Sequence, residues 1–390
     1  MANAAQSVAG IGDVERPTLA NWMEPPGNRW AFRHVREILP SERVAAAAAS
    51  RALPTTLSDD LLDLAYSSRD GSESTVRGML ERTYGDAFLV LHDGRVVAEW
   101  HAPGVAVDDR HILFSVTKSI TGLLAGVLAD EGALDPTGPV AELVPEVHGS
   151  AFGDASVRDL LDMSVAMKFV EDYSPGPDVL RYRRSSGWYP DAEEGLYEYL
   201  ASIPPDGDHG VQFRYLSPST DMLGWVCERA AGTTYAQALS RRLWAPMGAE
   251  ADGEMTVDRY GAPRAAGGLS ATLRDTARLG QLLIEGEGVL PEPLVEDVLR
   301  GGDPALWATN DWAYYFPGGA YRSSWYQHRE AGDGVVIAGG IHGQMIYVDA
   351  PRRVVVVKQS SWPTAEDEQA DFTTYAAAGA IARELAPGKS

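Results

Sequence analysis

Strand-like segments stand near both ends of this chain, and a long stretch without them separates the two groups. Residues 87–100, AFLVLHDGRVVAEW, are two β-rich runs around Asp93-Gly94, which is a strong sequence signal for a β-hairpin. Further runs rich in strand-forming residues follow near the end of the chain, at 334–340, 342–350 and 352–362. The pattern predicts one antiparallel sheet built from both chain ends, with helices covering its faces.

The stretch between these groups predicts a second lobe. Residues 141–310 are mostly helical and rich in loops, and 275–288 has the periodicity of an amphipathic helix. The predicted fold class is therefore α+β, with one lobe from residues 1–140 and 311–390 and a mostly helical lobe from 141–310. A cleft between two such lobes is the expected place for a small-molecule site.

The charge and the cysteine content exclude several classes of protein. With 33 basic and 55 acidic side chains among 390 residues, the net charge is −22, which opposes binding to nucleic acid or to an anionic membrane. The single cysteine, Cys227, lies in an apolar run and is interpreted as a core residue. The first residues lack the features of a secretory signal, and no run of 18 apolar residues exists. These features predict a cytoplasmic protein, for which a homodimer is the commonest assembly.

The segment 111–132, HILFSVTKSITGLLAGVLADEG, carries the strongest chemical signal. It predicts a helix from near Ser115 to Glu131, ended by Gly132. One helical turn separates Ser115 from Lys118, so both side chains lie on one face. A serine hydroxyl needs a neighbouring base to act as a nucleophile, and a lysine can be that base when burial lowers its pKa. The alternative is that Ser115 only caps the helix and Lys118 is a surface residue.

Two later motifs complete a serine–lysine acyl-transfer pattern. Tyr215 and Ser217 lie in the polar loop FRYLSPSTDMLGW, where a tyrosine can relay a proton, although it can also be a packing residue. The glycine-rich stretch AGGIHGQ, residues 338–344, allows a substrate to approach the backbone closely. Its N–H at Ile341 is the favoured oxyanion donor, with Gln344 or Met345 as alternatives in another register. His342 has a supporting role and no role as general base.

Ser115-Val-Thr-Lys118, Tyr215-Leu-Ser217 and Gly-Gly-Ile-His342-Gly occur in this order in the serine β-lactamase-like superfamily, which this chain resembles. That superfamily includes class C β-lactamases, D-alanyl-D-alanine carboxypeptidases and family VIII carboxylesterases. Over nearly the whole chain, the flanking segments resemble those of the 6-aminohexanoate-dimer hydrolases, which act on nylon oligomers. These segments include EPPGNRWAFRH, DDRHILFSVTKS, TDMLGW, LSATLRDTARLG and VKQSSWP.

The resemblance implies the β-lactamase/transpeptidase-like fold, an α/β sandwich with an all-helical lobe, and neither a cofactor nor a metal. It implies Ser115 as the acylated nucleophile, Lys118 as its base and Tyr215 as the group that assists proton transfer to the leaving amine. The N–H groups of Ser115 and Ile341 would then form the oxyanion hole. Residues expected to bind or support the substrate are His342, Ser217, Phe169, Tyr173 and Trp325.

Some positions depart from the patterns of these families. The third motif has no K-T-G lysine to pair with the carboxylate of a penicillin, which argues against a β-lactamase. The second motif is Tyr-Leu-Ser and not Tyr-x-Asn. The nylon-oligomer hydrolases carry a tyrosine near the segment KFVEDY, where this chain has Phe169, with Tyr173 four residues on. If that hydroxyl assists amide cleavage, esters are the better substrates here.

The sequence therefore predicts a serine hydrolase of small linear amides, with 6-aminohexanoate-dimer type substrates and activity on short-chain esters. The alternatives are a family VIII-type carboxylesterase without useful amidase activity, a β-lactamase or a D-alanyl-D-alanine carboxypeptidase. A non-catalytic scaffold or sensor is the alternative from another class. The eight histidines are scattered, without an H-E-x-x-H motif, and no G-x-S-x-G elbow is present, which disfavours metal hydrolases and α/β-hydrolases.

Overall fold

A computed structural model describes residues 16–172, 176–286 and 288–386. Its largest sheet has seven antiparallel strands in the order β5-β4-β13-β12-β11-β10-β9. Strand β4 pairs with β13, so the hairpin near the start of the chain joins the strands near its end, as the sequence predicts. The strands are β4 (Gly85–His92), β5 (Arg95–His101), β9 (Ala320–Arg322), β10 (Trp325–Gln327), β11 (Val335–Gly340), β12 (Gln344–Asp349) and β13 (Val354–Ser360).

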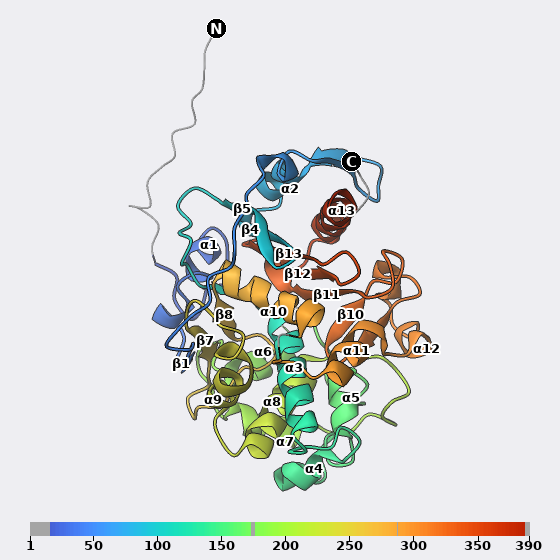
Figure 1. Ribbon diagram of the computed structural model, residues 1–390. Helices are drawn as coiled ribbons and strands as arrows, with labels where there is room; N and C mark the ends of the chain where they lie inside the picture. The colour runs from blue at the N-terminus through green and yellow to red at the C-terminus, as the bar shows by residue number, and fades with distance from the viewer. Residues whose placement is uncertain (1–15, 173–175, 287, 387–390) are drawn as a thin grey trace.

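Helices cover both faces of this sheet (Figure 1). Helix α13 (Glu368–Glu384) and α2 (Val76–Arg82) lie on one face, and α3 (Val116–Asp130) and α10 (Leu273–Glu285) lie on the other. Every residue of β12 and β13 is buried, because a strand covered on both sides loses the alternation of apolar and polar residues. The α+β sandwich predicted from the sequence is confirmed.

The predicted β4–β5 hairpin turns at Asp93 and Gly94, both with positive φ, at 47° and 71°. This is the backbone that Asp-Gly favours in a two-residue hairpin, so the prediction is confirmed. The strand predicted to begin at residue 342 begins instead at Gln344. His342 (φ 59°) and Gly343 (φ 84°) form a tight turn after β11, in a region of backbone space that an extended strand cannot adopt.

A second sheet has four short strands in the order β1-β7-β8-β6. The strands are β1 (Ser41–Val44), β6 (His111–Ile112), β7 (Gly253–Thr256) and β8 (Leu269–Ala271). Thus the middle of the chain, predicted as mostly helical, also contains strands. A strand of three or four residues is too short to show an alternating pattern, which is why the sequence did not predict it. A third pair, β2 (Ala65–Ser67) and β3 (Glu73–Thr75), lies beside α13.

The remaining helices are mostly short, and several of them, such as α4, α5, α7 and α8, lie around α3 at the end of the molecule away from α13 (Figure 1). They are α4 (Val140–Leu143), α5 (Val157–Leu161), α6 (Pro177–Ser185), α7 (Leu196–Ser202), α8 (Ser217–Ala231), α9 (Tyr235–Leu239), α11 (Glu292–Arg300) and α12 (Pro304–Trp307), with α1 (Asn28–Ala31) near the chain start. Cys227 is buried in α8, as predicted. In the described ranges, no helix is long and apolar enough to cross a bilayer.

Helix α3 runs through the centre of the molecule and holds the serine–lysine pair. It ends at Asp130, and Gly132 follows in the left-handed conformation that commonly ends helices (φ 71°), as the sequence predicts. A Cβ atom at Gly122 would lie 2.3 Å from the backbone oxygen of Ser323. The atoms nearest to a Cβ atom at Gly126 would be those of the flexible side chain of Leu294. Close packing of α3 therefore depends on both glycines, and most strictly on Gly122.

Replacing Gly122 with alanine should lower the free energy of unfolding by roughly 3 kcal/mol, because the backbone at Ser323 cannot move aside easily. Gly126→Ala is the matched control on the same helix, and its effect should be smaller because the Leu294 side chain can change rotamer. Urea unfolding of both variants measures the difference. Equal destabilisation would contradict this account of the helix packing.

Candidate active site

Ser115 and Lys118 meet at the N-terminus of α3. The chain leaves β6, turns at Phe114 with a positive φ of 44°, and enters the helix with Ser115 at its N-cap position. The Ser115 hydroxyl accepts no capping hydrogen bond from the helix backbone. Instead, Lys118 Nζ lies 2.8 Å from Ser115 Oγ. The one-turn spacing seen in the sequence therefore places an amine against a hydroxyl that has no capping function.

Lys118 is buried, with 1% of its surface exposed. Burial is the largest cause that lowers its pKa, to about 7; the charge of Glu171 opposes the shift and that of Arg264 adds to it. At neutral pH a large fraction of this lysine is therefore an uncharged amine that can accept the serine proton. The structure thus agrees with the burial and lowered pKa that the sequence analysis required of a base.

A buried polar network fixes the position of Lys118. The amine donates a second hydrogen bond, of 2.9 Å, to the backbone oxygen of Ala266. The Ala266 N–H in turn donates to Asp221 of α8 at 2.7 Å. Asp221 also accepts hydrogen bonds from the Tyr182 hydroxyl, at 2.5 Å, and from Arg264. Sequence reasoning missed this network, although a carboxylate inside the apolar run of α8 was a signal that could have found it.

Tyr215 is the third side chain at Ser115. Its hydroxyl forms hydrogen bonds with the side chains of Ser115 and Tyr326. Lys118 Nζ lies 4.9 Å from the centre of the Tyr215 ring. Burial raises the pKa of Tyr215 far above neutrality, and its hydrogen bonds to Ser115 and Tyr326 only partly oppose this. The side chain is therefore a phenol at neutral pH and has a proton to donate.

Ser217 is held by Glu171, a residue that the sequence analysis did not single out. Glu171 accepts hydrogen bonds from the Ser217 N–H, at 2.8 Å, and from the Ser217 hydroxyl, at 2.7 Å. Both residues line the space beside Lys118. Glu171 lies in the segment KFVEDY, from which only the aromatic residues Phe169 and Tyr173 were predicted to belong to the site. Its charge favours the protonated form of Lys118.

Replacing Glu171 with glutamine should move the acidic limb of the kcat/KM profile to lower pH. Removing a negative charge near an ammonium group disfavours the charged form, so the pKa of Lys118 falls below its present value of about 7. Glutamine keeps an acceptor for Ser217, so the geometry is largely retained. A pH series with p-nitrophenyl acetate measures the shift, and Glu198→Gln, an exposed position on α7, is the matched control. A shift to higher pH would contradict the assignment.

The end of β11 runs directly against the start of α3. A Cβ atom at Gly340 would lie 3.1 Å from the backbone nitrogen of Ser115 and 2.7 Å from the backbone oxygen of Leu113. Only glycine allows this approach, which brings the following residue, Ile341, to the nucleophile. Of the three candidate oxyanion donors, Ile341 lines the space around Ser115, whereas Gln344 and Met345 belong to β12, where they are paired with Gly340 and Gly339 of β11.

His342 lies in this turn and packs against two aromatic rings. Its ring is 4.9 Å from that of Phe32 and 5.3 Å from that of Phe114, and Nδ1 lies 2.8 Å from the backbone oxygen of Trp362. Burial lowers its pKa to about 4, so the imidazole is neutral at pH 7. These contacts fit a supporting role, and the absence of a general-base function stays a prediction from the sequence.

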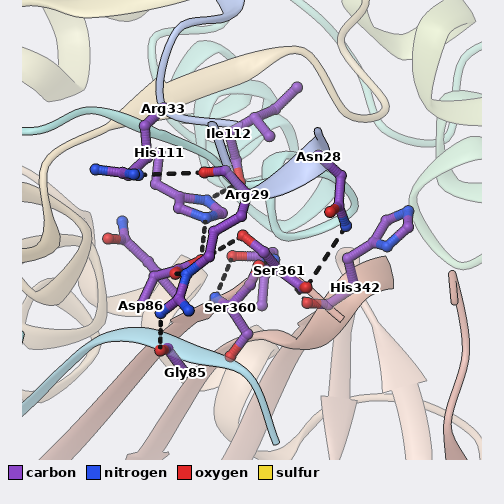
Figure 2. A network of polar contacts seen from close by, with 12 residues as sticks. Asn28, Arg29, Arg33, Gly85, Asp86, His111, Ile112, His342, Ser360 and Ser361 are labelled. Carbon is purple, nitrogen blue, oxygen red and sulfur yellow. Dashed lines mark hydrogen bonds and ion pairs between the residues drawn. The ribbon is translucent and has the colours of Figure 1, made fainter. Parts of the chain in front are cut away.

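A polar network behind His342 joins distant parts of the chain (Figure 2). Asp86 is completely buried and accepts hydrogen bonds from Arg29, at 2.8 Å, and Ser361, while His111 Nε2 lies 3.3 Å away. Asn28 donates a 2.9 Å hydrogen bond to the backbone oxygen of Trp362, which also contacts His342. The network connects segments at the chain start, before α3 and after β13. Three of the family-like segments quoted above supply most of its members, whereas Asp86 comes from β4.

Two cavities open from Ser115. The smaller, of about 40 Å³, is lined by Lys118, Phe169 and Ser217, and the larger, of about 280 Å³, by Tyr215 and other aromatic residues. The structure thus brings Phe169 and Ser217 to the site. Tyr173 lies outside the described residues. Trp325 is buried in the core and lines neither cavity; its neighbour Tyr326 lines the larger one, because successive side chains of a strand point to opposite faces.

In the described part of the chain, no group of three or more His, Cys, Asp or Glu side chains is arranged to hold a metal ion. The chemistry of the site described above comes from an alcohol, an amine, a phenol and backbone N–H groups. These are the parts of a serine hydrolase with a lysine base.

Comparison with known proteins agrees with this chemistry. The β-lactamase family model matches residues 73–380. The chain therefore belongs to the β-lactamase family of serine hydrolases. Among its relatives is the 6-aminohexanoate-dimer hydrolase of Paenarthrobacter ureafaciens, which is 41% identical over 359 residues, covering 89% of this chain and 88% of the relative. The resemblance stated from the sequence is confirmed.

Solved structures show the same fold. One is the structure of a "Putative 6-aminohexanoate-dimer hydrolase from Bacillus anthracis". The superposition includes 96% of this chain and 100% of that protein, with a TM-score of 0.83 and 26% identity. A second structure is that of EstCE1, a hydrolase with promiscuous acyltransferase activity. The superposition includes 79% of this chain and 97% of EstCE1, with a TM-score of 0.65 and 16% identity. The second likeness concerns the fold alone.

Proposed function

We propose that this serine hydrolase cleaves small linear amides of the 6-aminohexanoate-dimer type through an acyl-enzyme on Ser115, and that it also cleaves short-chain esters. The observation that carries the proposal is the contact of one hydroxyl with both an amine of lowered pKa and a protonated phenol. The 41% identical relative of P. ureafaciens, a 6-aminohexanoate-dimer hydrolase, supports the substrate type.

In the proposed acylation step, neutral Lys118 accepts the proton of Ser115 as Oγ attacks the carbonyl carbon. The N–H groups of Ser115 and Ile341 donate hydrogen bonds to the oxyanion that forms. Tyr215 then donates its proton to the leaving nitrogen, the C–N bond breaks, and the proton held by Lys118 restores the phenol. Water hydrolyses the ester of Ser115 by the same groups acting in reverse, and no cofactor takes part.

Assays with one amide and one ester measure which of the two bonds this enzyme prefers to cleave. Incubation with the linear 6-aminohexanoate dimer should release the monomer, and p-nitrophenyl acetate should release p-nitrophenol. If only the ester is hydrolysed, the chain is a family VIII-type carboxylesterase, an alternative favoured by Phe169 where the nylon-oligomer hydrolases have a tyrosine. Hydrolysis of nitrocefin would favour a β-lactamase, although β11 carries no lysine to pair with a penicillin carboxylate. Turnover of none of these would support a scaffold or sensor.

The cytoplasmic location and the homodimer stay predictions from the sequence. Cell fractionation tests the location, and light scattering combined with size-exclusion chromatography tests the assembly.

A further inference from the structure

The larger cavity has an acidic end. Ser115 and Tyr215 lie at one side of it, and Glu366, Glu368 and Asp371 line it where α13 begins. Among the described residues, no lysine or arginine lines this cavity. The nearby basic groups lie behind its walls: Lys358 is fully buried with its Nζ 5.0 Å from the Trp362 ring, and Arg69 packs on Phe372. A ligand that fills the cavity therefore meets carboxylates without a basic side chain beside it.

Two of these carboxylates, those of Glu366 and Glu368, have no positively charged partner in the described part of the chain. The Glu366 carboxylate has no hydrogen bond or ion pair there, and Glu368 accepts only a 2.9 Å hydrogen bond from the Tyr314 hydroxyl. Asp371 is hydrogen-bonded to the Tyr375 phenol. Burial raises the pKa of Asp371 to about 7, and Lys358 opposes this rise only in part. A bound cation would supply the missing charge.

The other walls of the cavity suit the same ligand. They are aromatic, and a cation over an aromatic face is attracted by the ring electrons. Carboxylates and aromatic rings together are the surroundings that recognise an alkylammonium group, and they repel a carboxylate. The aromatic side chains are those of Trp307, Trp312, Tyr314, Tyr315, Phe316, Tyr326, Trp362 and Tyr375.

The positions of the reacting groups indicate which part of a substrate enters this cavity. The two proposed oxyanion donors, Ser115 and Ile341, line both cavities, so the scissile carbonyl lies where they meet. Lys118 lines only the smaller cavity and Tyr215 only the larger. Since Tyr215 is the proposed proton donor to the leaving atom, the leaving group extends into the larger cavity and the acyl chain into the smaller.

We propose that the larger cavity is a leaving-group subsite that selects amines and alcohols whose far end carries an ammonium group and disfavours those that end in a carboxylate. The inference rests on the proposed function and refines it. An amide whose leaving amine is a short diamine is then a better substrate than the 6-aminohexanoate dimer, whose leaving group ends in a carboxylate.

Three amides with one hexanoyl acyl group test this proposal. Their leaving amines are 1,6-diaminohexane, 1-aminohexane and 6-aminohexanoate, which differ only at the far end. At about pH 8, where free carboxylates and alkylammonium groups are both ionised, kcat/KM should fall in that order, by at least about tenfold from first to last. The double variant E366Q/D371N should bring the ratio of first to last close to unity. Glu198→Gln, exposed on α7, should leave the ratio unchanged.

A second measurement does not depend on amide cleavage. The three free amines are compared as inhibitors of p-nitrophenyl acetate hydrolysis, and the inhibition constant should be lowest for the diamine and highest for 6-aminohexanoate. Thermal unfolding checks that each variant is folded. An equal or reversed order in the inhibition series, or a ratio that the double variant leaves unchanged, would overturn the subsite. If the ester is not hydrolysed, the proposed function is wrong. If the ester is hydrolysed but the three amines do not inhibit in the expected order, only the proposed subsite is wrong.

Discussion

Ser115→Ala should lower kcat for p-nitrophenyl acetate by about 10⁴-fold or more and leave the free energy of unfolding almost unchanged. Activity is lost because no other group can form the acyl-enzyme. Stability is retained because the Ser115 hydroxyl makes no capping bond to its helix, and because Lys118, which loses its contact with Ser115, keeps its hydrogen bond to Ala266. Since a mutation at a helix cap usually lowers stability, the combination separates a nucleophile from a structural serine.

Ser119→Ala, one turn further along α3, is the matched control. Its hydroxyl donates a 2.6 Å hydrogen bond to the backbone oxygen of Ser324 and is buried. Its removal should lower the free energy of unfolding by about 1–3 kcal/mol and leave the acyl-enzyme chemistry in place. Mass spectrometry after treatment with a fluorophosphonate should find the label on Ser115. A label on another serine, or an active Ser115→Ala variant, would contradict the assignment.

Lys118→Met should lower kcat/KM by about 10²–10⁴-fold, the usual contribution of a general base. In the unmodified enzyme, kcat/KM should rise with pH through about 7, because Lys118 accepts the serine proton only when it is neutral. This rise should be absent from the residual activity of the methionine variant. Lys168→Met is the control, since Lys168 is exposed, and it should keep the profile.

The same lysine should affect stability in a predictable direction. Its pKa in the folded chain, about 7, lies below the ordinary value of 10.5. Between these two values the unfolded chain binds more protons, so the free energy of unfolding contributed by Lys118 rises with pH across this window. Urea unfolding at several pH values should show a smaller rise for Lys118→Met than for the unmodified enzyme. An identical rise, or a pH-independent kcat/KM, would show that Lys118 is not the base of lowered pKa.

The structural elements that could be predicted are those whose residue pattern is complete within a short segment of the chain. The β4–β5 hairpin follows from two apolar runs and Asp93-Gly94, and α3 from its apolar face and Gly132. The contact of Ser115 with Lys118 also follows from one helical turn. By contrast, β7 and β8 are stabilised mainly by pairing with distant strands, and their few residues show no period of their own.

The supporting residues of the site could not be predicted for a related reason. Glu171 reaches Ser217 across 46 positions of the chain, and Asn28 reaches Trp362 across 334. A charged or amide side chain gives no sign in the sequence of which distant partner it meets. The alternation of β10 likewise decides that Tyr326, and not Trp325, lines the cavity, and this depends on which face of the strand meets the core.

By itself, the sequence determined the class of fold, the serine–lysine pair and the order of the motifs, because helix and hairpin geometry follow from local residue patterns. Only the tertiary structure decided how strongly Lys118 is buried, and therefore its pKa. It also decided which glycine approaches Ser115 and which carboxylates face the larger cavity. Burial and electrostatic surroundings are sums over all neighbours in space, and most of those neighbours come from other segments of the chain.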